Sequence, residues 1–282
     1  MTTPPEAAAA TIELACRELK MPGLRAGYPA IARDAASQGQ HYTAFLAACL
    51  AAEIASRRQH RLASHLAQAR FPALKTLDAF DFAAVPALPK TTVLALADGA
   101  FIRDRQNVIC LGGPGLGKTH VATALGVACI QAGYRVRFTT AVTLSQELLL
   151  AQQEFRLPRY LTSWHRVDLV VLDEFGYLGL GPGGPLLFQF CADRYERGSL
   201  ILTTNLDFSR WVEVLGDAAL TAALLDRLTH HAHILLFQSD ESYRFRQRRA
   251  RLGEAIAAQT ARPPDIDVAP APSAPPAPGG PR

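Results

Sequence analysis

The chain has 282 residues, of which 49% are hydrophobic and 19% charged, with a formal net charge of +4. This composition is typical of a folded globular protein with one large core or two domains. It contains no apolar run near the roughly 20 residues of a membrane-spanning helix, and the mild charge alone is weak evidence for a polyanionic partner.

The first ten residues, MTTPPEAAAA, lack the basic and apolar segments of a signal peptide, so we expect a cytoplasmic protein. Five cysteines stand far apart in apolar surroundings, with no CxxC pair and no histidine at ligand spacing. We therefore predict buried thiols at Cys16, Cys49, Cys110, Cys129 and Cys191.

Residues 12–70 are predicted to be helical. Breaks are expected at Pro22-Gly23 and Gln38-Gly39, and an amphipathic helix follows them. Its apolar positions recur at helical spacing: Tyr42, Phe45, Leu46, Cys49, Leu50 and Ile54. These features predict a small helical N-terminal domain over residues 1–70.

The same helix continues into the basic stretch RRQHRLASH. Arg57, Arg61 and His65 are spaced four apart on one helix face, with Arg58 and His60 beside them. This stripe is either an ordinary solvated face or a surface that contacts phosphates.

After residue 100 the pattern changes to short apolar runs separated by helical segments. The runs are NVICLG, RVRFTT, VDLVVLD, SLILTTN and HILLFQ. Such runs are typical of strands buried on both faces of a parallel sheet, so we predict an α/β domain with five parallel strands over residues 71–261. The segment FPALKTLDAFDFAAVPALPK before it is expected to be an ordered connector, and the Pro/Ala-rich residues 262–282 to be disordered.

The strongest motif directly follows the first predicted strand. Residues 112–119, GGPGLGKT, match the phosphate-binding pattern GxxxxGK[ST] at every fixed position. Glycines let successive backbone N–H groups converge on phosphates at the start of a helix, Lys118 should reach the β- and γ-phosphates, and Thr119 should bind Mg²⁺. A glycine turn without nucleotide is the alternative. The predicted ATP-binding residues are Gly112, Gly113, Pro114, Gly115, Leu116, Gly117, Lys118, Thr119 and His120.

Two further strands end on polar residues. VDLVVLDEF carries Asp173 and Glu174, whose side chains should point apart if strand geometry persists. Asp173 suits the Mg²⁺ held by Thr119, and Glu174 suits the activation of a water for attack on the γ-phosphate. Asn205 ends SLILTTN and would approach the γ-phosphate if its strand lies between the other two; otherwise it is a routine turn residue.

Two arginines are candidates for contacting the transferred phosphoryl group. Arg227 lies in the helical segment LTAALLDRLTHHA, and Arg244 begins a basic run after the last strand. An arginine from a neighbouring subunit can stabilise the developing charge in such sites. A surface pair between Arg227 and an acid such as Asp226, and an ordinary basic helix at Arg244, are the alternatives.

With these motifs in place, the chain resembles the IstB-like ATPases, helper proteins encoded beside the transposase in one class of bacterial insertion sequences. The resemblance covers about residues 40–250 and includes GAFIRDRQNVICLGGPGLGKTHVATALG and VDLVVLDEFGYL. The stretch from RYERGS to HHAHIL is more diagnostic than GKT or DE. The family is similar to bacterial helicase loaders and belongs to the AAA+ class of ATPases.

The resemblance implies an ATPase that uses ATP and Mg²⁺, forms homo-oligomers on duplex DNA with little base readout, and recruits and activates a transposase. By position, residues 112–119 would be Walker A, Asp173 and Glu174 Walker B, and Asn205 sensor 1. Arg227 would act in trans, and Arg244 would be an ATP-contacting sensor-2 arginine. DNA would be held by basic faces that include Arg57, Arg58 and Arg61, and hydrolysis would dismantle the assembly.

Two other functions share part of these motifs. A replicative helicase loader would share every nucleotide motif and would differ in the partner that its N-terminal domain holds. A small-molecule kinase on a P-loop core would need an acceptor pocket and usually an arginine-rich lid, and the sequence contains no such segment.

Overall fold

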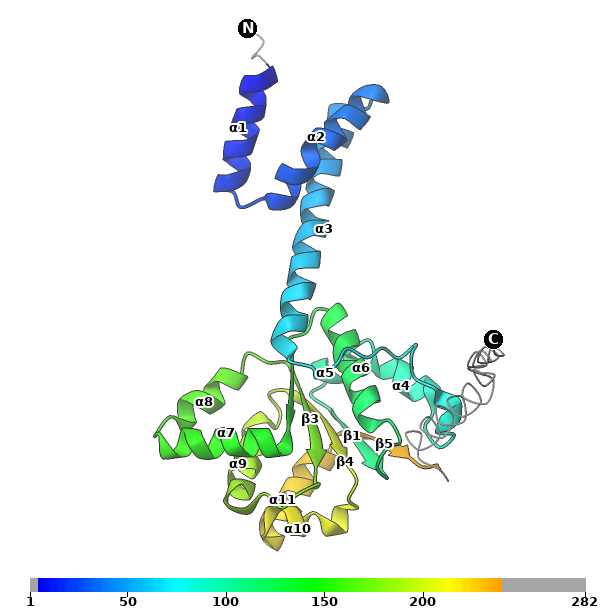
Figure 1. Ribbon diagram of the computed structural model, residues 1–282, viewed down its shortest axis with the longest axis vertical. Coiled ribbons are helices and arrows are strands. Elements are labelled where there is room, and N and C mark those ends of the chain that lie inside the picture. The colour runs from blue at the N-terminus through cyan, green and yellow to red at the C-terminus, as the bar shows by residue number, and fades with distance from the viewer. Residues whose placement is uncertain (1–4, 240–282) are drawn as a thin grey trace, which may run out of the picture.

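The computed structural model describes residues 5–239 as a helical N-terminal part joined to an α/β domain (Figure 1). The helical part comprises α1 (Pro5–Glu18), α2 (Pro22–Ser37) and α3 (Tyr42–Ala69). With 28 residues, α3 is about 42 Å long and reaches from this part to the sheet. The predicted disordered tail and Arg244 lie outside the described residues.

The predicted amphipathic helix is confirmed as α3, but most of its apolar stripe faces no other described element. Four members are largely exposed: Tyr42 (86%), Leu46 (55%), Leu50 (44%) and Ile54 (51%). Instead, α2 packs on the neighbouring side of α3, where a Cβ on Gly23 would overlap the Ser56 side chain. Small residues let two helix backbones approach closely. For this reason α2 packs on the side of α3 that carries small residues and not on the stripe of large side chains.

A buried carboxylate holds this helical part together. Glu53 on α3 accepts hydrogen bonds from the backbone N–H of Leu24 (2.9 Å) and from Nε of Arg57 (2.6 Å). The hydrogen bond from Arg57 holds the pKa of Glu53 below its usual value. Arg57 also donates to the carbonyl oxygen of Lys20, so its guanidinium ties α3 to the turn between α1 and α2.

The α/β domain contains the five predicted strands, all parallel. They are β1 (Asn107–Gly112), β2 (Val136–Thr140), β3 (Leu169–Phe175), β4 (Ser199–Thr204) and β5 (Ala232–Phe237). Their order in the sheet is β2-β3-β4-β1-β5. The strand β4 therefore lies between β1 and β3, as the interpretation of Asn205 required.

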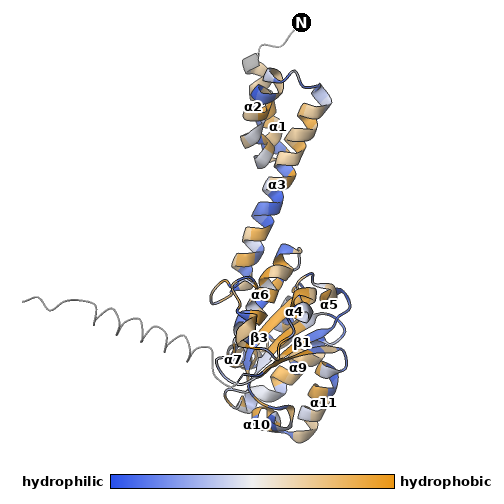
Figure 2. Ribbon diagram, turned by 90° about the vertical axis from the view of Figure 1, so that its right-hand side faces the viewer, coloured by the Kyte–Doolittle hydropathy of each residue, from blue (hydrophilic) through white to orange (hydrophobic). Residues whose placement is uncertain are grey.

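Helices cover both faces of the sheet, and apolar strands fill the space between them (Figure 2). One face carries α4 (Lys90–Leu96), α5 (Ala100–Arg103) and α6 (Lys118–Gln131). The other carries α7 (Ala141–Gln153), α8 (Leu157–Trp164), α9 (Gly184–Arg194), α10 (Val212–Leu215) and α11 (Ala218–Thr229). Short 3-10 turns occur at Phe82–Ala84, Gly181–Gly183 and Phe208–Arg210.

The connector between the two parts is ordered, as predicted. Phe80 and Phe82 pack against the core on the α6 face, and Val85 is buried in it. The last turns of α3 join the same core through Leu62 and Leu66. By packing, the α/β domain therefore begins inside α3, before the boundary at residue 71 that the sequence predicts.

All five cysteines are free and buried, as predicted. Burial raises the pKa of Cys110, Cys129 and Cys191 to about 12, so these thiols stay protonated and inert at neutral pH. Across residues 5–239, no helix combines the length and the apolar character needed to cross a membrane.

The stretch RYERGS begins with a buried arginine, Arg194, which has a structural role. Arg194, at the end of α9, is 3% exposed and donates hydrogen bonds to the carbonyl oxygens of Trp164 (3.1 Å) and Val167 (3.0 Å). Burial lowers its pKa to about 10. A Cβ on Gly198 would overlap the guanidinium, so a larger residue there would displace Arg194. Arg194 thus fixes the loop that leads into β3.

We expect Arg194→Met to lower the free energy of unfolding by about 3 kcal/mol, because the buried carbonyl groups would lose their donor. Urea denaturation monitored by circular dichroism would measure this loss. The matched control is Arg197→Met, which removes an exposed arginine paired with Asp193 and should cost less than about 1 kcal/mol. Equal effects of the two substitutions would contradict the role of Arg194.

Candidate functional site

The loop between β1 and α6 is shaped for an anion. Gly112 (φ 154°) has no room for a Cβ beside the carbonyl of Phe237, and a Cβ on Gly117 (φ 91°) would press on Phe80. The helix α6 begins immediately afterwards, at Lys118, and its N-cap residue Gly117 has no side chain with which to cap it. The positive end of the helix dipole therefore lies at the loop, where it favours a negatively charged ligand.

Lys118 places a positive charge inside this loop. Its side chain is 5% exposed, and Nζ donates hydrogen bonds to the carbonyl oxygens of Gly112 (2.6 Å) and Gly113 (2.7 Å). These bonds hold the ammonium group within the ring of backbone that the glycines form. The loop and its lysine together fit a phosphate group.

A hydroxyl and a carboxylate from distant parts of the chain meet beside the loop. Thr119 Oγ1 on α6 donates a hydrogen bond to Asp173 Oδ1 on β3, at 2.9 Å. Thr203 Oγ1 on β4 donates to the same carboxylate oxygen. Asp173 is 4% exposed, and both hydroxyls hydrogen-bond one oxygen of its carboxylate. Hard oxygen donors of this kind suit Mg²⁺.

The side chains of Glu174 and Asp173 point apart, as the sequence predicts. The reason, however, is not that regular strand geometry continues to the end of β3. The register between β3 and β4 shifts between Leu172 and Phe175, which marks a β-bulge. Glu174 lies in this bulge with φ 60°, and its side chain is exposed while Asp173 is buried. The backbone N–H of Glu174 donates to Thr203 Oγ1 at 3.0 Å, which stabilises the unusual conformation.

Asn205 directly follows β4, at the carboxyl edge of the sheet between β1 and β3. Its Oδ1 atom is buried and has no hydrogen-bond partner among the described residues. A buried acceptor without a donor indicates a ligand or a water at that position. The amide oxygen therefore remains available to accept a hydrogen bond at this edge of the sheet.

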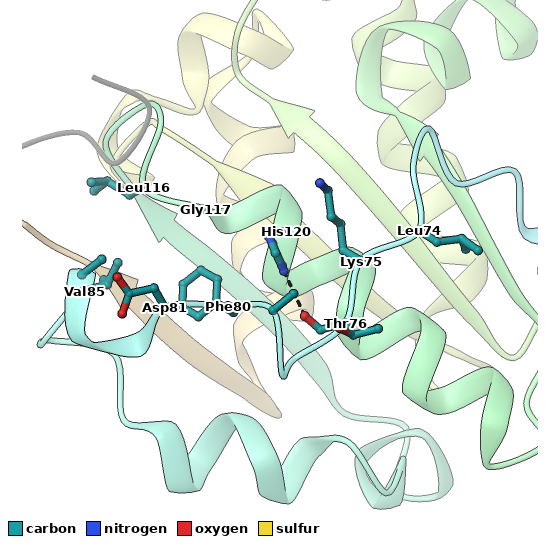
Figure 3. A pocket seen from close by; sticks show the side chains of 11 residues that line it. Leu74, Lys75, Thr76, Phe80, Asp81, Val85, Leu116, Gly117 and His120 are labelled. Carbon is teal, nitrogen blue, oxygen red and sulfur yellow. Dashed lines mark hydrogen bonds between the residues drawn. The ribbon is translucent and has the colours of Figure 1, made fainter. Parts of the chain in front are cut away.

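Two adjacent hollows flank the loop. The first, of about 370 Å³, lies between the connector and the start of α6, with Leu74, Phe80, Val85 and Leu116 among its apolar lining residues (Figure 3). In Figure 3, Phe80 lies between Asp81 and His120, and the His120 ring is hydrogen-bonded to the carbonyl oxygen of Thr76. The second hollow, of about 260 Å³, is lined by the loop from Gly117 to His120 and by Thr203. The two hollows share Lys75, Gly117 and His120, so they adjoin at the start of α6.

Several lining residues were missed by the sequence analysis. Lys75 lines both hollows, Thr76 and Asp81 line the first, and Tyr177 lines the second. The aromatic and proline content of the connector is the signal that could have indicated the first three. Tyr177 follows Glu174 by three residues, and nothing in its local sequence distinguishes it from an ordinary loop residue.

The remaining candidates lie apart from the loop. Arg227 on α11 donates to the carbonyl oxygen of Ala223 (2.8 Å), and its guanidinium lies 5.5 Å from the ring centre of Phe188 on α9. Both helices cover the sheet face opposite α6, so the structure does not bring Arg227 to the loop of its own chain. Arg57, Arg58 and Arg61 lie on α3, with Arg57 in the network described above.

Comparisons with known proteins show the family to which the chain belongs. The family model described as IstB-like ATP binding protein matches residues 14–251. An ATP-binding protein of insertion sequence IS21 from Pseudomonas aeruginosa is 41% identical over 84% of this chain and 90% of its own length. The corresponding protein of insertion sequence IS5376 from Geobacillus stearothermophilus is 37% identical over 83% and 93%.

Solved structures share the fold at lower identity. DnaA from Aquifex aeolicus, solved with AMPPCP, is 20% identical with a TM-score of 0.51, over 65% of this chain. The match spans 56% of that protein, a little over half of its length. This similarity confirms the predicted AAA+ P-loop fold of the α/β domain.

Proposed function

This chain belongs to the family of IstB-like ATP-binding proteins, and from that premise we propose that it is a helper ATPase of insertion-sequence transposition. It binds duplex DNA as an ATP-dependent homo-oligomer, recruits and activates a partner transposase, and dismantles the assembly by hydrolysing ATP. One observation carries the proposal: the strand order brings the glycine loop, the Asp173–Glu174 pair and Asn205 to one edge of the sheet.

The residues at this edge fit ATP. The triphosphate lies against the loop amides and Lys118, and the base enters the first hollow, beside Phe80. Thr119 and Asp173 would hold Mg²⁺, which would supply positive charge to the β- and γ-phosphates. Residues 5–239 contain no cluster of three or more His, Cys, Asp or Glu for a metal. In proteins, Mg²⁺ is commonly bound by one or two carboxylates together with substrate phosphates and water.

Three side chains of the chain have separate roles in ATP hydrolysis. Glu174, exposed at the bulge, orients the attacking water and accepts its proton. The Oδ1 atom of Asn205 accepts a hydrogen bond from the same water. Asp173 stays buried and oriented by the two threonine hydroxyls.

Thr203 acts as a positioning residue in this scheme. Its hydroxyl accepts from the backbone N–H of Glu174 and donates to Asp173, so one side chain orients the Asp173 carboxylate and stabilises the backbone at Glu174. We expect Thr203→Val to lower kcat for ATP hydrolysis about tenfold, the effect of losing one charged hydrogen bond, with little change in ATP affinity. Steady-state ATPase assays and titration with a fluorescent ATP analogue would measure the two quantities.

Two variants control for simple loss of packing. Thr203→Ser keeps the hydroxyl and should restore most of the rate. Thr204→Val changes the neighbouring buried threonine, whose hydroxyl bonds with the backbone of Leu206, and should leave kcat near its original value. A Thr203→Ser variant as slow as Thr203→Val would contradict the positioning role.

Calorimetry with the purified chain and Mg·ATP tests the nucleotide site directly. A heat of binding that disappears in Lys118→Ala is expected, because the buried ammonium would no longer face the phosphates. Absence of any heat with the unchanged chain would remove the basis of the proposal. Micrographs with ATP and duplex DNA then test assembly, and affinity capture with transposase or replicative helicase separates a transposition helper from a helicase loader.

A further inference from the structure

The end of the α/β domain that meets α3 carries a strongly basic groove. It is a hollow of about 670 Å³ whose lining includes Arg70, Arg135, Arg137 and Arg166, and no lining residue is acidic. We name these four residues the basic groove. It lies where α3, the start of β2 and the loop before β3 meet, at the amino ends of these strands. The nucleotide loop follows β1 at its carboxyl end, so the groove is a separate feature.

The arginines of the basic groove differ in how far their charge is neutralised. Arg135 forms an ion pair with Asp168 at 2.9 Å, and this bond raises the pKa of Arg135 above its usual value. Arg70 and Arg166 are exposed and have no carboxylate partner within residues 5–239. Arg137 lies over the buried ring of Trp164, 4.6 Å from the ring centre, and also lacks an acidic partner there. Three guanidinium groups therefore have net charge available for an anion.

The basic groove continues onto α3. Arg58, Arg61, His65 and Gln68 share one helix face by their spacing, and Gln68 also lines the groove. From Arg58 to Arg70 this face extends about 18 Å along a rigid helix. Duplex DNA presents about ten phosphate charges over that length, counting both strands. Figure 1 shows α3 reaching the α/β domain between α8 and α6. The basic face of α3 and the basic groove therefore form one surface that joins both parts of the molecule.

The chemistry of the lining favours duplex phosphates over other anions. Besides the arginines, the lining residues are serine, glutamine, alanine and valine, with no exposed aromatic ring. Proteins that bind single-stranded nucleic acid use aromatic side chains on which bases stack, and stable protein interfaces are usually anchored by buried aromatic side chains. The ring of Trp164, which lies beside Arg137, is buried and covered by that guanidinium.

We propose that the basic groove, together with Arg58 and Arg61 of α3, is a binding site for the phosphate backbone of duplex DNA. This inference rests on the proposed DNA binding and adds Arg70, Arg137 and Arg166 of the α/β domain to the interface. Arg57 has a smaller part in it, because its guanidinium is already bonded to Glu53 and Lys20. Contacts are to phosphates, so binding has little dependence on base sequence.

The test uses the full chain with Mg·ATP and a labelled duplex of mixed sequence, followed by fluorescence anisotropy over a range of salt concentrations. The double variant Arg70→Gln/Arg166→Gln should bind about twentyfold more weakly at 0.15 M salt, with a salt dependence lower by about one unit for each arginine. Arg210→Gln is the control, because Arg210 is an exposed arginine just before α10, and α10 lies at the end of the α/β domain opposite α3 in Figure 1. ATP affinity and the melting temperature should not change in any of these variants.

Three outcomes would overturn the inference in distinguishable ways. A double variant with unchanged affinity and salt dependence would remove the basic groove from the interface and leave the proposed function standing. A double variant that keeps DNA affinity but no longer captures transposase would assign the groove to a protein partner. No ATP-dependent binding of duplex by the unchanged chain would refute the DNA-binding part of the proposed function itself.

Discussion

Glu174→Gln is expected to lower kcat for ATP hydrolysis by about a thousandfold while ATP and DNA binding persist. Glutamine has nearly the shape of glutamate but cannot accept a proton from the attacking water. The bulge should persist, because the hydrogen bond to Thr203 comes from the backbone N–H of residue 174 and not from its side chain. Phosphate release under saturating ATP measures the rate, and anisotropy with labelled duplex measures DNA binding.

The matched control is Glu213→Gln, which changes another exposed glutamate, paired with Arg210 outside the site. This variant should hydrolyse ATP at the original rate. If Glu174→Gln also retained full turnover, another group would have to activate the water. A stable ATP-bound complex of Glu174→Gln on DNA would in addition support the proposal that hydrolysis dismantles the assembly.

Arg227→Ala is expected to reduce hydrolysis by about a thousandfold in the assembled protein, with ATP affinity little changed. Within one chain Arg227 contacts Ala223 and Phe188 on the sheet face away from α6. It can therefore act on ATP only from a neighbouring subunit. Since the nucleotide would then be shared between two subunits, ATP binding and assembly would be thermodynamically coupled.

Mixing two inactive variants separates this role from a structural one. Arg227→Ala supplies a complete loop, and Lys118→Ala supplies an intact arginine, so a mixture should regain part of the activity. If Arg227 served only to pack on Phe188, the mixture would remain inactive and Arg227→Ala would instead show a lowered melting temperature. Absence of rescue would argue against a site shared between subunits.

The local sequence was sufficient to predict the helices and strands and the glycine-rich loop of the proposed nucleotide site. The octapeptide at residues 112–119 restricts its own backbone, and each apolar run predicts a buried strand whatever its neighbours are. The same holds for the helical part, whose breaks at Pro22-Gly23 and Gln38-Gly39 match the limits of α2 closely. These features depend on residues within a few positions of one another.

Contacts between distant parts of the chain determined how those helices and strands are arranged relative to one another. The sheet order places β4 beside β3, and only then can Thr203 bond both Asp173 and Glu174 across a bulge that no local pattern predicts. The first hollow forms only because the connector folds back on α6. The basic groove forms only because Arg70, at the end of α3, lies beside Arg137 and Arg166. Register and sheet order minimise the free energy of the whole core, so contacts between residues 30 to 100 positions apart cannot be derived from either segment alone.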